Sequence, residues 1–439
     1  MDNMTPIVAA AALAAAFVLI LKRPRGWTAP IAGLLLAAVF LLTTFTSQHA
    51  TIANYTAAFG PALTVLSTLV MSAVLESLGI FRYAAVNMIE FSKGSGLRLY
   101  WVTALFCFLM TMFFSTYVSI MVATPIIVRI AGQLGMSDKQ RMPYLVSGVL
   151  IGSAASAPIG AANVTNLAAF ELLPGHNLNR FAEQMFVPSL IAVAVIAGLL
   201  FLLFRGRMPK RLAEPAKTAA DVQEEGPPVE WRLFRIAILV VVTVRAGFFI
   251  GSGFEVPIWC FAFTGALLLI VLGMLGTGRG LRDIAAKTPW YIPLFALSAS
   301  TIADGLQQTG IPRFIAFAVS RAADFGDLPA LLTAGGLLAV MSGIAGQLPS
   351  LLLGTLSLTD MSAGSGLLQL IFSAHIMGAN IGGLITPVGA FAPIMWMLLL
   401  RRHQVKLSWT AYMKAAAVTI PAGLVTGLIS LYAWTQIIG

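Results

Sequence analysis

Charged residues are scarce in this chain: only 10% of its 439 residues are Asp, Glu, Lys or Arg, while 58% are hydrophobic. An ordinary soluble domain carries about 25% charged residues. The low charge content therefore excludes a soluble globular protein and predicts a polytopic membrane protein. The net charge of +10 does not indicate nucleic-acid binding, because the basic residues fall in short links between apolar runs. Such a distribution is typical of cytoplasmic loops.

Cysteine and histidine are equally scarce. The two cysteines, Cys107 and Cys260, each lie inside an apolar run, and the four histidines are scattered without the spacing of metal ligands. This excludes a disulfide framework and gives no support for a metal site. No nucleophile, base and orienting residue form a recognisable set, so the sequence predicts neither an enzyme nor a bound cofactor.

Long apolar runs make up most of the chain. Because a spanning helix needs about 20 apolar residues, the runs predict helices at 5–21, 28–46, 58–80, 186–204, 233–254, 256–275, 290–307 and 411–437. The first run shows no cleavage pattern, so we expect residues 1–27 to hold a retained helix and not a signal peptide. A basic, proline-containing stretch at 205–232 predicts a cytoplasmic linker between two halves, 28–204 and 233–439.

Two further apolar stretches, 99–134 and 328–358, are too long for one span. They are interrupted near their middles by Phe114-Ser115-Thr116-Tyr117 and by Gly346-Gln347-Leu348-Pro349, which predicts two re-entrant hairpins. Each is followed by a run with helix-breaking residues at its centre, 142–172 and 366–400. Unwound backbone at membrane depth is tolerated only where protein or a water-filled cavity covers it. Both broken helices are therefore candidate binding sites.

The two halves also match in sequence. Ala157-Pro158-Ile159-Gly160-Ala161 corresponds to Thr386-Pro387-Val388-Gly389-Ala390 at an offset of 229 positions, and 75–83 corresponds to 306–314 at an offset of 231. An odd number of crossings between the latter copies predicts inverted repeats, which are typical of secondary transporters. The distribution of Lys and Arg, with 22 of 27 in predicted inside loops, predicts an all-α membrane protein of about 11 transmembrane helices with both termini outside.

The helix breaks define the candidate substrate site. The N-terminal end of a half-helix offers unpaired N–H groups and about half a positive charge, which suits anions and neutral oxyacids. Uncharged polar side chains and glycines at the breaks and hairpin tips complete the set. The predicted substrate-binding residues are Ser115, Thr116, Asn163, Thr165, Asn166, Gln347, Asn380, Gly382, Gly383, Thr386 and Gly389. The alternative is that the polar side chains only bridge helices and the glycines only allow close packing.

Three charged residues fall in or near apolar runs. Arg245 lies within the predicted helix 233–254, where it could attract anions, pair with a backbone carbonyl, or extend its head to the interface. Glu76 and Asp304 lie near helix ends, where we expect solvated end groups; they are the nearest carboxylates available for proton coupling.

The segments 382–390, 395–402 and 405–409 resemble the ion transporter superfamily, which includes the ArsB arsenite permeases, the NhaD antiporters and the divalent-anion/sodium symporters. The order of elements is most similar to ArsB. The resemblance implies two hairpins and two broken helices that meet around one substrate site. The chain departs from ArsB at both hairpin tips, where ArsB proteins typically carry Asn-Asp and Asn-Asn-Met-Pro, and at Ala379-Asn380, where they carry Cys-Asp.

This resemblance implies a secondary transporter that exports arsenite, antimonite or a related small oxyacid across the bacterial inner membrane by alternating access. The alternatives are a sodium- or proton-coupled carrier of another anion, a cation/proton antiporter and, outside transport, a channel or membrane anchor subunit. H⁺ and Na⁺ are the candidate coupling ions. Besides the lipid bilayer and the small substrate, the resemblance implies a homodimer and an arsenite-stimulated ATPase subunit as candidate partners, and no nucleic acid.

Overall fold

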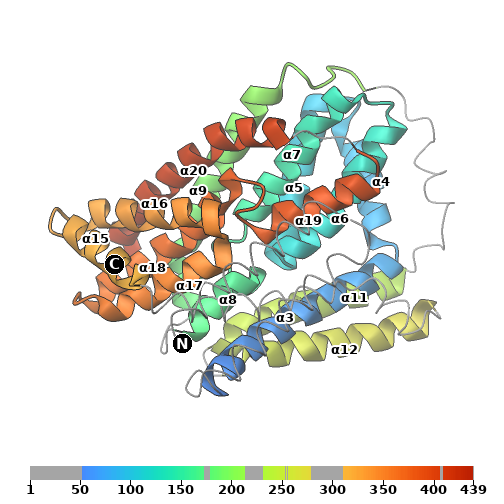
Figure 1. Cartoon of the computed structure of the whole chain (residues 1–439). Helices are drawn as coiled ribbons and strands as arrows, with labels where there is room; N and C mark the ends of the chain where they lie inside the picture. Colours follow the sequence, from blue (N-terminus) through green and yellow to red (C-terminus); the bar gives the residue numbers. More distant parts are fainter. Residues whose placement is uncertain are drawn as a thin grey trace, which may run out of the picture.

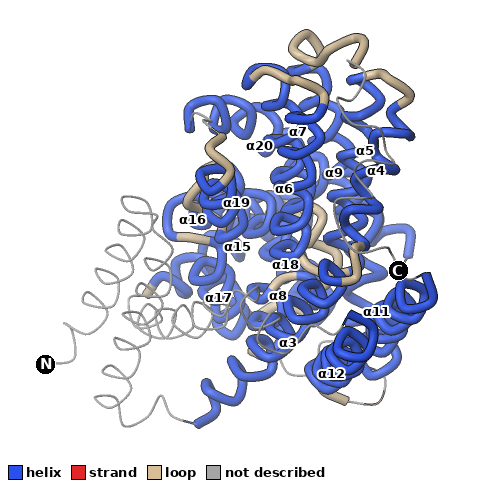
Figure 2. The backbone as a smooth tube through the Cα atoms, turned by 90° about the vertical axis from the view of Figure 1, so that its right-hand side faces the viewer, coloured by secondary structure: helices blue, strands red, loops and turns tan. Residues whose placement is uncertain are grey.

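The computed structural model describes residues 52–172, 178–212, 231–252, 254, 256–277, 310–405 and 409–438. The helices predicted at 5–21, 28–46 and 290–307, and most of the linker, lie outside these ranges. Within them every regular element is helical (Figure 2). Nine of the described helical segments are long and apolar enough to cross a membrane, which confirms the all-α membrane class.

The first half contains two helices joined by a tight turn, an interrupted helix and a closing helix. The hairpin turns at Ser115, whose hydroxyl caps the second leg by accepting a hydrogen bond from the Val118 amide at 3.3 Å. The interrupted helix loses its α-helical backbone at 155–163, a stretch that contains one 3₁₀ turn (Gly160–Ala162). In chain order the elements are α3 (Ile52–Ser77), α4 (Ile80–Ser92), α5 (Gly96–Phe113), α6 (Thr116–Gln133), α7 (Asp138–Ala154), α8 (Val164–Glu171) and α9 (Leu178–Phe204).

The second half repeats this order after two long helices. The second interruption differs in form: the chain stays helical through a π-helical turn (Gly378–Gly382) and a 3₁₀ turn (Gly383–Ile385), and unwinds only at 386–390. In chain order the elements are α11 (Trp231–Ser252), α12 (Ile258–Thr277), α15 (Ile311–Ala323), α16 (Asp327–Ala345), α17 (Gln347–Ser357), α18 (Ser365–Met377), α19 (Phe391–Arg402) and α20 (Trp409–Ile438).

Two short helices were not predicted. Each has 13 residues and precedes a hairpin: α4 follows Gly79, and α15 follows Gly310. The two glycines have nearly the same left-handed backbone, with φ of 81° and 79°, a conformation that glycine adopts without a Cβ penalty. They occupy corresponding places in the sequence match at an offset of 231. The structure also begins α9 at Leu178 and not at 186, because its first turns carry polar residues that an apolar run does not include.

Contacts between the halves are reciprocal. Helix α6 of the first hairpin packs on α19, beyond the second interruption, and α17 of the second hairpin packs on α8, beyond the first. The closing helices α9 and α20 pack on each other (Figure 1), where a Cβ at Gly423 would collide with the Ile196 side chain and a Cβ at Gly427 would come within 2.9 Å of the Ala192 Cβ. This arrangement brings both interruptions to the centre of the molecule; the inverted orientation of the halves and the exact number of crossings stay predictions.

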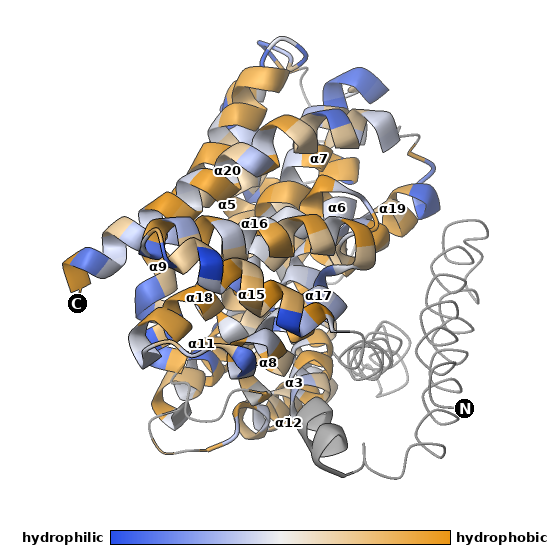
Figure 3. Ribbon diagram, turned by 60° about the vertical axis from the view of Figure 1, so that its left-hand side comes forward, coloured by the Kyte–Doolittle hydropathy of each residue, from blue (hydrophilic) through white to orange (hydrophobic). Residues whose placement is uncertain are grey.

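The outer surface suits a lipid environment. Figure 3 shows hydrophobic residues along much of α16 and α20, with hydrophilic residues in the loops at the top and again around α15 and α18. Large apolar side chains such as Leu239, Leu268 and Val340 are more than half exposed. The described start of the linker, 205–212, is not fully solvated: Met208 is buried, and the Leu212 amide donates a hydrogen bond to the Gly94 carbonyl at 2.9 Å.

Candidate substrate site between the two interrupted helices

Asn380 lies at the centre of the candidate site. It occupies the middle of the π-helical turn and is 1% exposed. Its side-chain oxygen accepts hydrogen bonds from the Ser156 hydroxyl at 3.1 Å and the Asn163 amide at 3.0 Å, and a third from the Gln347 amide. These donors come from the first interruption and from the tip of the second hairpin. One side chain therefore joins three separate elements.

The side-chain nitrogen of Asn380 also forms hydrogen bonds. Its Nδ2 donates to the Asn166 Oδ1 at 2.7 Å and to the Ile376 carbonyl at 2.8 Å. Asn166 in turn donates to the Ser156 carbonyl at 3.2 Å, which lacks the i+4 partner of a continuous helix and accepts only a longer turn bond from the Ile159 amide at 3.4 Å. The amide network thus supplies partners for backbone groups that the interruption leaves unpaired.

Asn163 is the N-cap of α8, the helix that follows the first interruption. It has extended backbone and precedes α8, and its Oδ1 accepts a hydrogen bond from the Thr165 amide at 3.1 Å, which is the usual N-cap geometry. The same oxygen accepts a bond from the Tyr117 hydroxyl at 3.1 Å. Tyr117 belongs to α6 and packs edge-on against Phe391 of α19. The first hairpin therefore also reaches the site.

We name these residues the amide cluster: Tyr117, Ser156, Asn163, Asn166, Gln347 and Asn380. Four of the six were predicted from the sequence as substrate-binding residues. The hydrogen bonds that join the cluster involve only neutral groups, so the cluster presents amides and hydroxyls without a formal charge. Because these residues are buried in the membrane-spanning part of the fold, bulk water is excluded from the site. Hydrogen bonds in such a site are stronger than in water.

The remaining predicted residues lie around this cluster and have other contacts. The Thr165 side chain is buried, and the Thr116 hydroxyl is buried without a hydrogen-bond partner. The Thr386 hydroxyl donates to the Gly343 carbonyl of α16 at 2.7 Å, and Ser115 caps α6. Substrate binding by these four residues stays a prediction.

The predicted glycines allow close packing. A Cβ at Gly382 would collide with Ala339 of α16, and a Cβ at Gly389 would collide with the Gly383 carbonyl. The π-helical turn can therefore approach α16 only because these positions lack side chains. That is the packing alternative stated for them above, and direct contact with substrate stays a prediction.

Two residues of the cluster were missed. Ser156 immediately precedes the repeated Ala-Pro-Ile-Gly-Ala segment, and Tyr117 belongs to the interruption that predicted the first hairpin tip. The positions of both residues could have indicated a role in the site, since each lies at a break in an apolar run. Their residue types gave no such indication, because serine and tyrosine are common in membrane helices as packing groups.

Sequence comparison identifies relatives over nearly the whole chain. The profile of the ArsB family, described as arsenical pump membrane protein, matches residues 9–435. A Bacillus subtilis (strain 168) protein that carries the arsenical pump membrane protein name is 32% identical over 391 residues, covering 85% of this chain and 87% of the relative. An Escherichia coli arsenical pump membrane protein is 25% identical over 432 residues, covering 96% of this chain and 97% of its own.

A solved structure shares the fold. The crystal structure of the Alcanivorax borkumensis YdaH transporter, described as having an unusual topology, superposes with a TM-score of 0.53 at 15% sequence identity and covers 88% of this chain and 87% of its own. The profile match and the Bacillus subtilis relative confirm the resemblance derived from 382–390 and its neighbours. The chain belongs to the ArsB family of arsenical pump membrane proteins, a family of membrane transporters and not of enzymes.

Proposed function

We propose that this protein exports arsenite, antimonite or a related small neutral oxyacid across the bacterial inner membrane by alternating access, with the amide cluster as its substrate site. The observation that carries the proposal is the neutral character of this buried cluster at the point where both interruptions meet. The names of the relatives support the substrate class.

The chemistry of the cluster fits such a substrate. At neutral pH arsenite is mainly the uncharged acid As(OH)₃, whose hydroxyls both donate and accept hydrogen bonds. Amides and hydroxyls can exchange bonds with these groups without the large desolvation cost of burying a charge. A permanent charge in the site would favour an ion of opposite sign, and none of the hydrogen bonds that join the cluster involves one.

The cluster also contains more hydrogen-bond donors around Asn380 Oδ1 than that oxygen can fully bind. Three donors lie within hydrogen-bond distance of Asn380 Oδ1, although a carbonyl oxygen has two lone pairs, and the Ser156 hydroxyl has a second acceptor in the Ser153 carbonyl at 2.8 Å. One donor can therefore turn to a substrate oxygen while the asparagine keeps its other partners. Gln347 suits this role, because it comes from the tip of the second hairpin and can leave without breaking either interrupted helix.

Expression in an arsenite-hypersensitive, efflux-deficient host tests the proposal. We expect the wild-type chain to restore growth on arsenite and to lower cellular arsenic, and an Asn380→Ala variant of equal membrane abundance to do both less effectively. Unchanged cellular arsenic with wild-type protein present in the membrane would contradict the proposed substrate.

Uptake into everted membrane vesicles identifies the coupling ion, for which H⁺ and Na⁺ are the candidates. Collapse of the proton gradient should abolish arsenite accumulation if H⁺ is the coupling ion. Dependence on a sodium gradient alone would favour the sodium-coupled alternative.

A further inference from the structure

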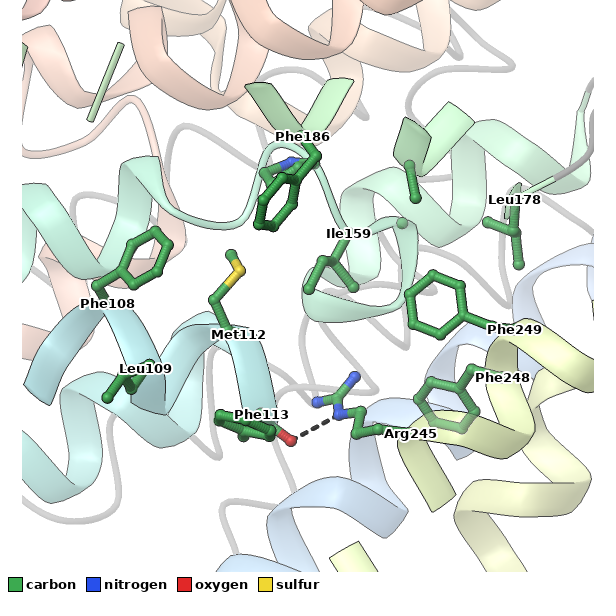
Figure 4. A pocket seen from close by; sticks show the side chains of 13 residues that line it. Phe108, Leu109, Met112, Phe113, Ile159, Leu178, Phe186, Arg245, Phe248 and Phe249 are labelled. Carbon is green, nitrogen blue, oxygen red and sulfur yellow. Dashed lines mark hydrogen bonds between the residues drawn. The ribbon is translucent and has the colours of Figure 1, made fainter. Parts of the chain in front are cut away.

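A cavity of about 390 Å³ lies beside the first interruption (Figure 4), and no residue of the amide cluster is part of its lining. Its walls come from α5, from the unwound 158–160, and from α9 and α11. Apolar residues form nearly all of the lining, including Met112, Ile159, Phe186 and Phe249. Its size lies within the ~300–1,000 Å³ range of small-molecule sites.

The one charged residue in this lining is Arg245 of α11, which is 8% exposed. Its Nε donates to the Phe113 carbonyl at 2.6 Å, at the last residue of α5, and its guanidinium carbon lies 5.1 Å from the Phe248 ring centroid. Of the three possibilities that the sequence left open, pairing with a backbone carbonyl is thus confirmed. Both Nη atoms are buried without a hydrogen-bond partner, and the guanidinium points into the cavity (Figure 4).

A buried guanidinium with two unpaired Nη atoms needs an anion as its partner. A buried guanidinium is stable only when its charge is paired and its N–H groups are bonded. The carbonyl of Phe113 satisfies Nε alone, and no acidic side chain is among the described residues that line the cavity. The two free Nη atoms present the paired donors that bind a carboxylate or phosphate through two oxygens.

The lining shows where the ligand comes from. Leu109, Phe113, Phe186 and Phe249 are 40%, 46%, 47% and 39% exposed, and in a membrane-spanning protein such side chains face lipid. The ligand therefore enters from the bilayer and places an apolar body against these residues.

We propose that the Arg245 cavity binds a single-chain carboxylic acid of the fatty-acid class, with its carboxylate on the two Nη atoms and its chain along the aromatic wall. Arg245 lies seven residues before the end of α11, about 10 Å inside the helix at 1.5 Å per residue. A carboxylic acid can reach that depth in its protonated form and ionise at the guanidinium. A phosphodiester headgroup cannot shed its charge in this way.

The position of the cavity gives the ligand a structural consequence. Pro158, Ile159 and Gly160 line it, and the same unwound segment carries Ser156 and Asn163 of the amide cluster. An occupant thus contacts the same segment that carries part of the substrate site.

Binding of the fluorescent fatty acid cis-parinaric acid to the purified full-length chain in neutral detergent tests the proposal. We expect saturable binding that oleic acid displaces and methyl oleate does not, because the ester has the same chain without the charge. Equal displacement by the ester, displacement by phosphatidylglycerol but not by oleic acid, or non-saturable partition would each overturn the proposal. This comparison needs only the wild-type protein.

Two variants locate the site. Arg245→Met should weaken cis-parinaric acid binding at least tenfold, whereas Arg235→Met, the same change at an exposed position of α11, should leave it unchanged. Ala182→Phe should also weaken binding, because it fills the cavity while keeping Arg245. Wild-type affinity in Arg245→Met, or equal losses in Arg235→Met, would overturn the assignment.

Discussion

The side chains of Asn163 and Asn380, 217 positions apart in the chain, join through an amide–amide hydrogen bond of 3.0 Å. The contact ties the two interrupted helices to each other at the centre of the fold. The two residues do not occupy corresponding positions in the repeat: at the offset of 229, Asn380 corresponds to Ile151 and Asn163 corresponds to Ala392. Each half thus contributes a different asparagine to one cluster.

We expect Asn163→Ala and Asn380→Ala each to weaken substrate binding by about threefold to tenfold, because a hydrogen bond to a neutral partner contributes roughly 0.5–1.5 kcal/mol net. Arsenite uptake into everted vesicles, normalised to protein abundance, measures the effect. The double variant should lose less than the two single losses combined, because the residues share one network. Asn87→Ala serves as control, since Asn87 bonds only within its own helix, to the Tyr83 carbonyl. Wild-type affinity in either single variant would make that asparagine a packing residue.

Asn380→Asp should make transport depend on pH. The Nδ2 of Asn380 faces two acceptors, Asn166 Oδ1 and the Ile376 carbonyl, and the backbone carbonyl cannot turn away. An aspartate at this position can replace one donated bond only when it is protonated, and its ionised form would repel both acceptors. The ratio of variant to wild-type uptake should therefore rise as the pH falls from about 8 to about 6, on either side of neutrality. A constant ratio would show that the donors at Nδ2 do not matter for transport.

Gly382→Ala should lower the thermal unfolding midpoint of the purified protein, because the added methyl group collides with the Cα and Cβ of Ala339. Overpacking of this kind typically costs about 1–3 kcal/mol. Gly336→Ala on α16 is the matched control, as a Cβ there meets no atom within 4 Å. Equal midpoints for the two variants would show that the π-helical turn can move away from α16.

A cysteine introduced at Gln223 should react with a membrane-impermeant maleimide only after the cells are permeabilised, because the linker carries many of the predicted inside charges. The native Cys107 is buried and Cys260 is partly exposed, so both should be replaced by alanine in the background protein. Labelling of intact cells would overturn the predicted topology, including both termini outside.

The sequence predicted the hairpins within a few residues, because a cluster of turn-forming residues inside an apolar run has few other structural solutions. Thr116 begins α6 and Gln347 begins α17, both inside the tips predicted from sequence. The second interruption was harder to predict in detail. Glycine-rich 378–385 stays helical as π and 3₁₀ turns, since tight packing on α16 holds the backbone there; that contact depends on tertiary structure.

The partners of Asn380 could be predicted only in part. Asn163 and Gln347 were found because polar residues at breaks are expensive unless they are paired. Ser156 and Tyr117 were missed because their roles follow from distances between elements far apart in sequence. The short helices α4 and α15 were missed because 13 residues with scattered charges do not form an apolar run.

Those short helices bear on how the chain enters the membrane during synthesis. At 1.5 Å per residue, 13 residues extend only about 20 Å, less than the ~30 Å hydrocarbon layer, so neither helix can be inserted as a span. On α15, the exposed Phe314 and Phe317 lie beside Arg313 and Arg321, a combination suited to the boundary between headgroups and acyl chains. Helix α15 can therefore rest at that boundary while the following hairpin folds, and so fix the depth to which the hairpin tip descends.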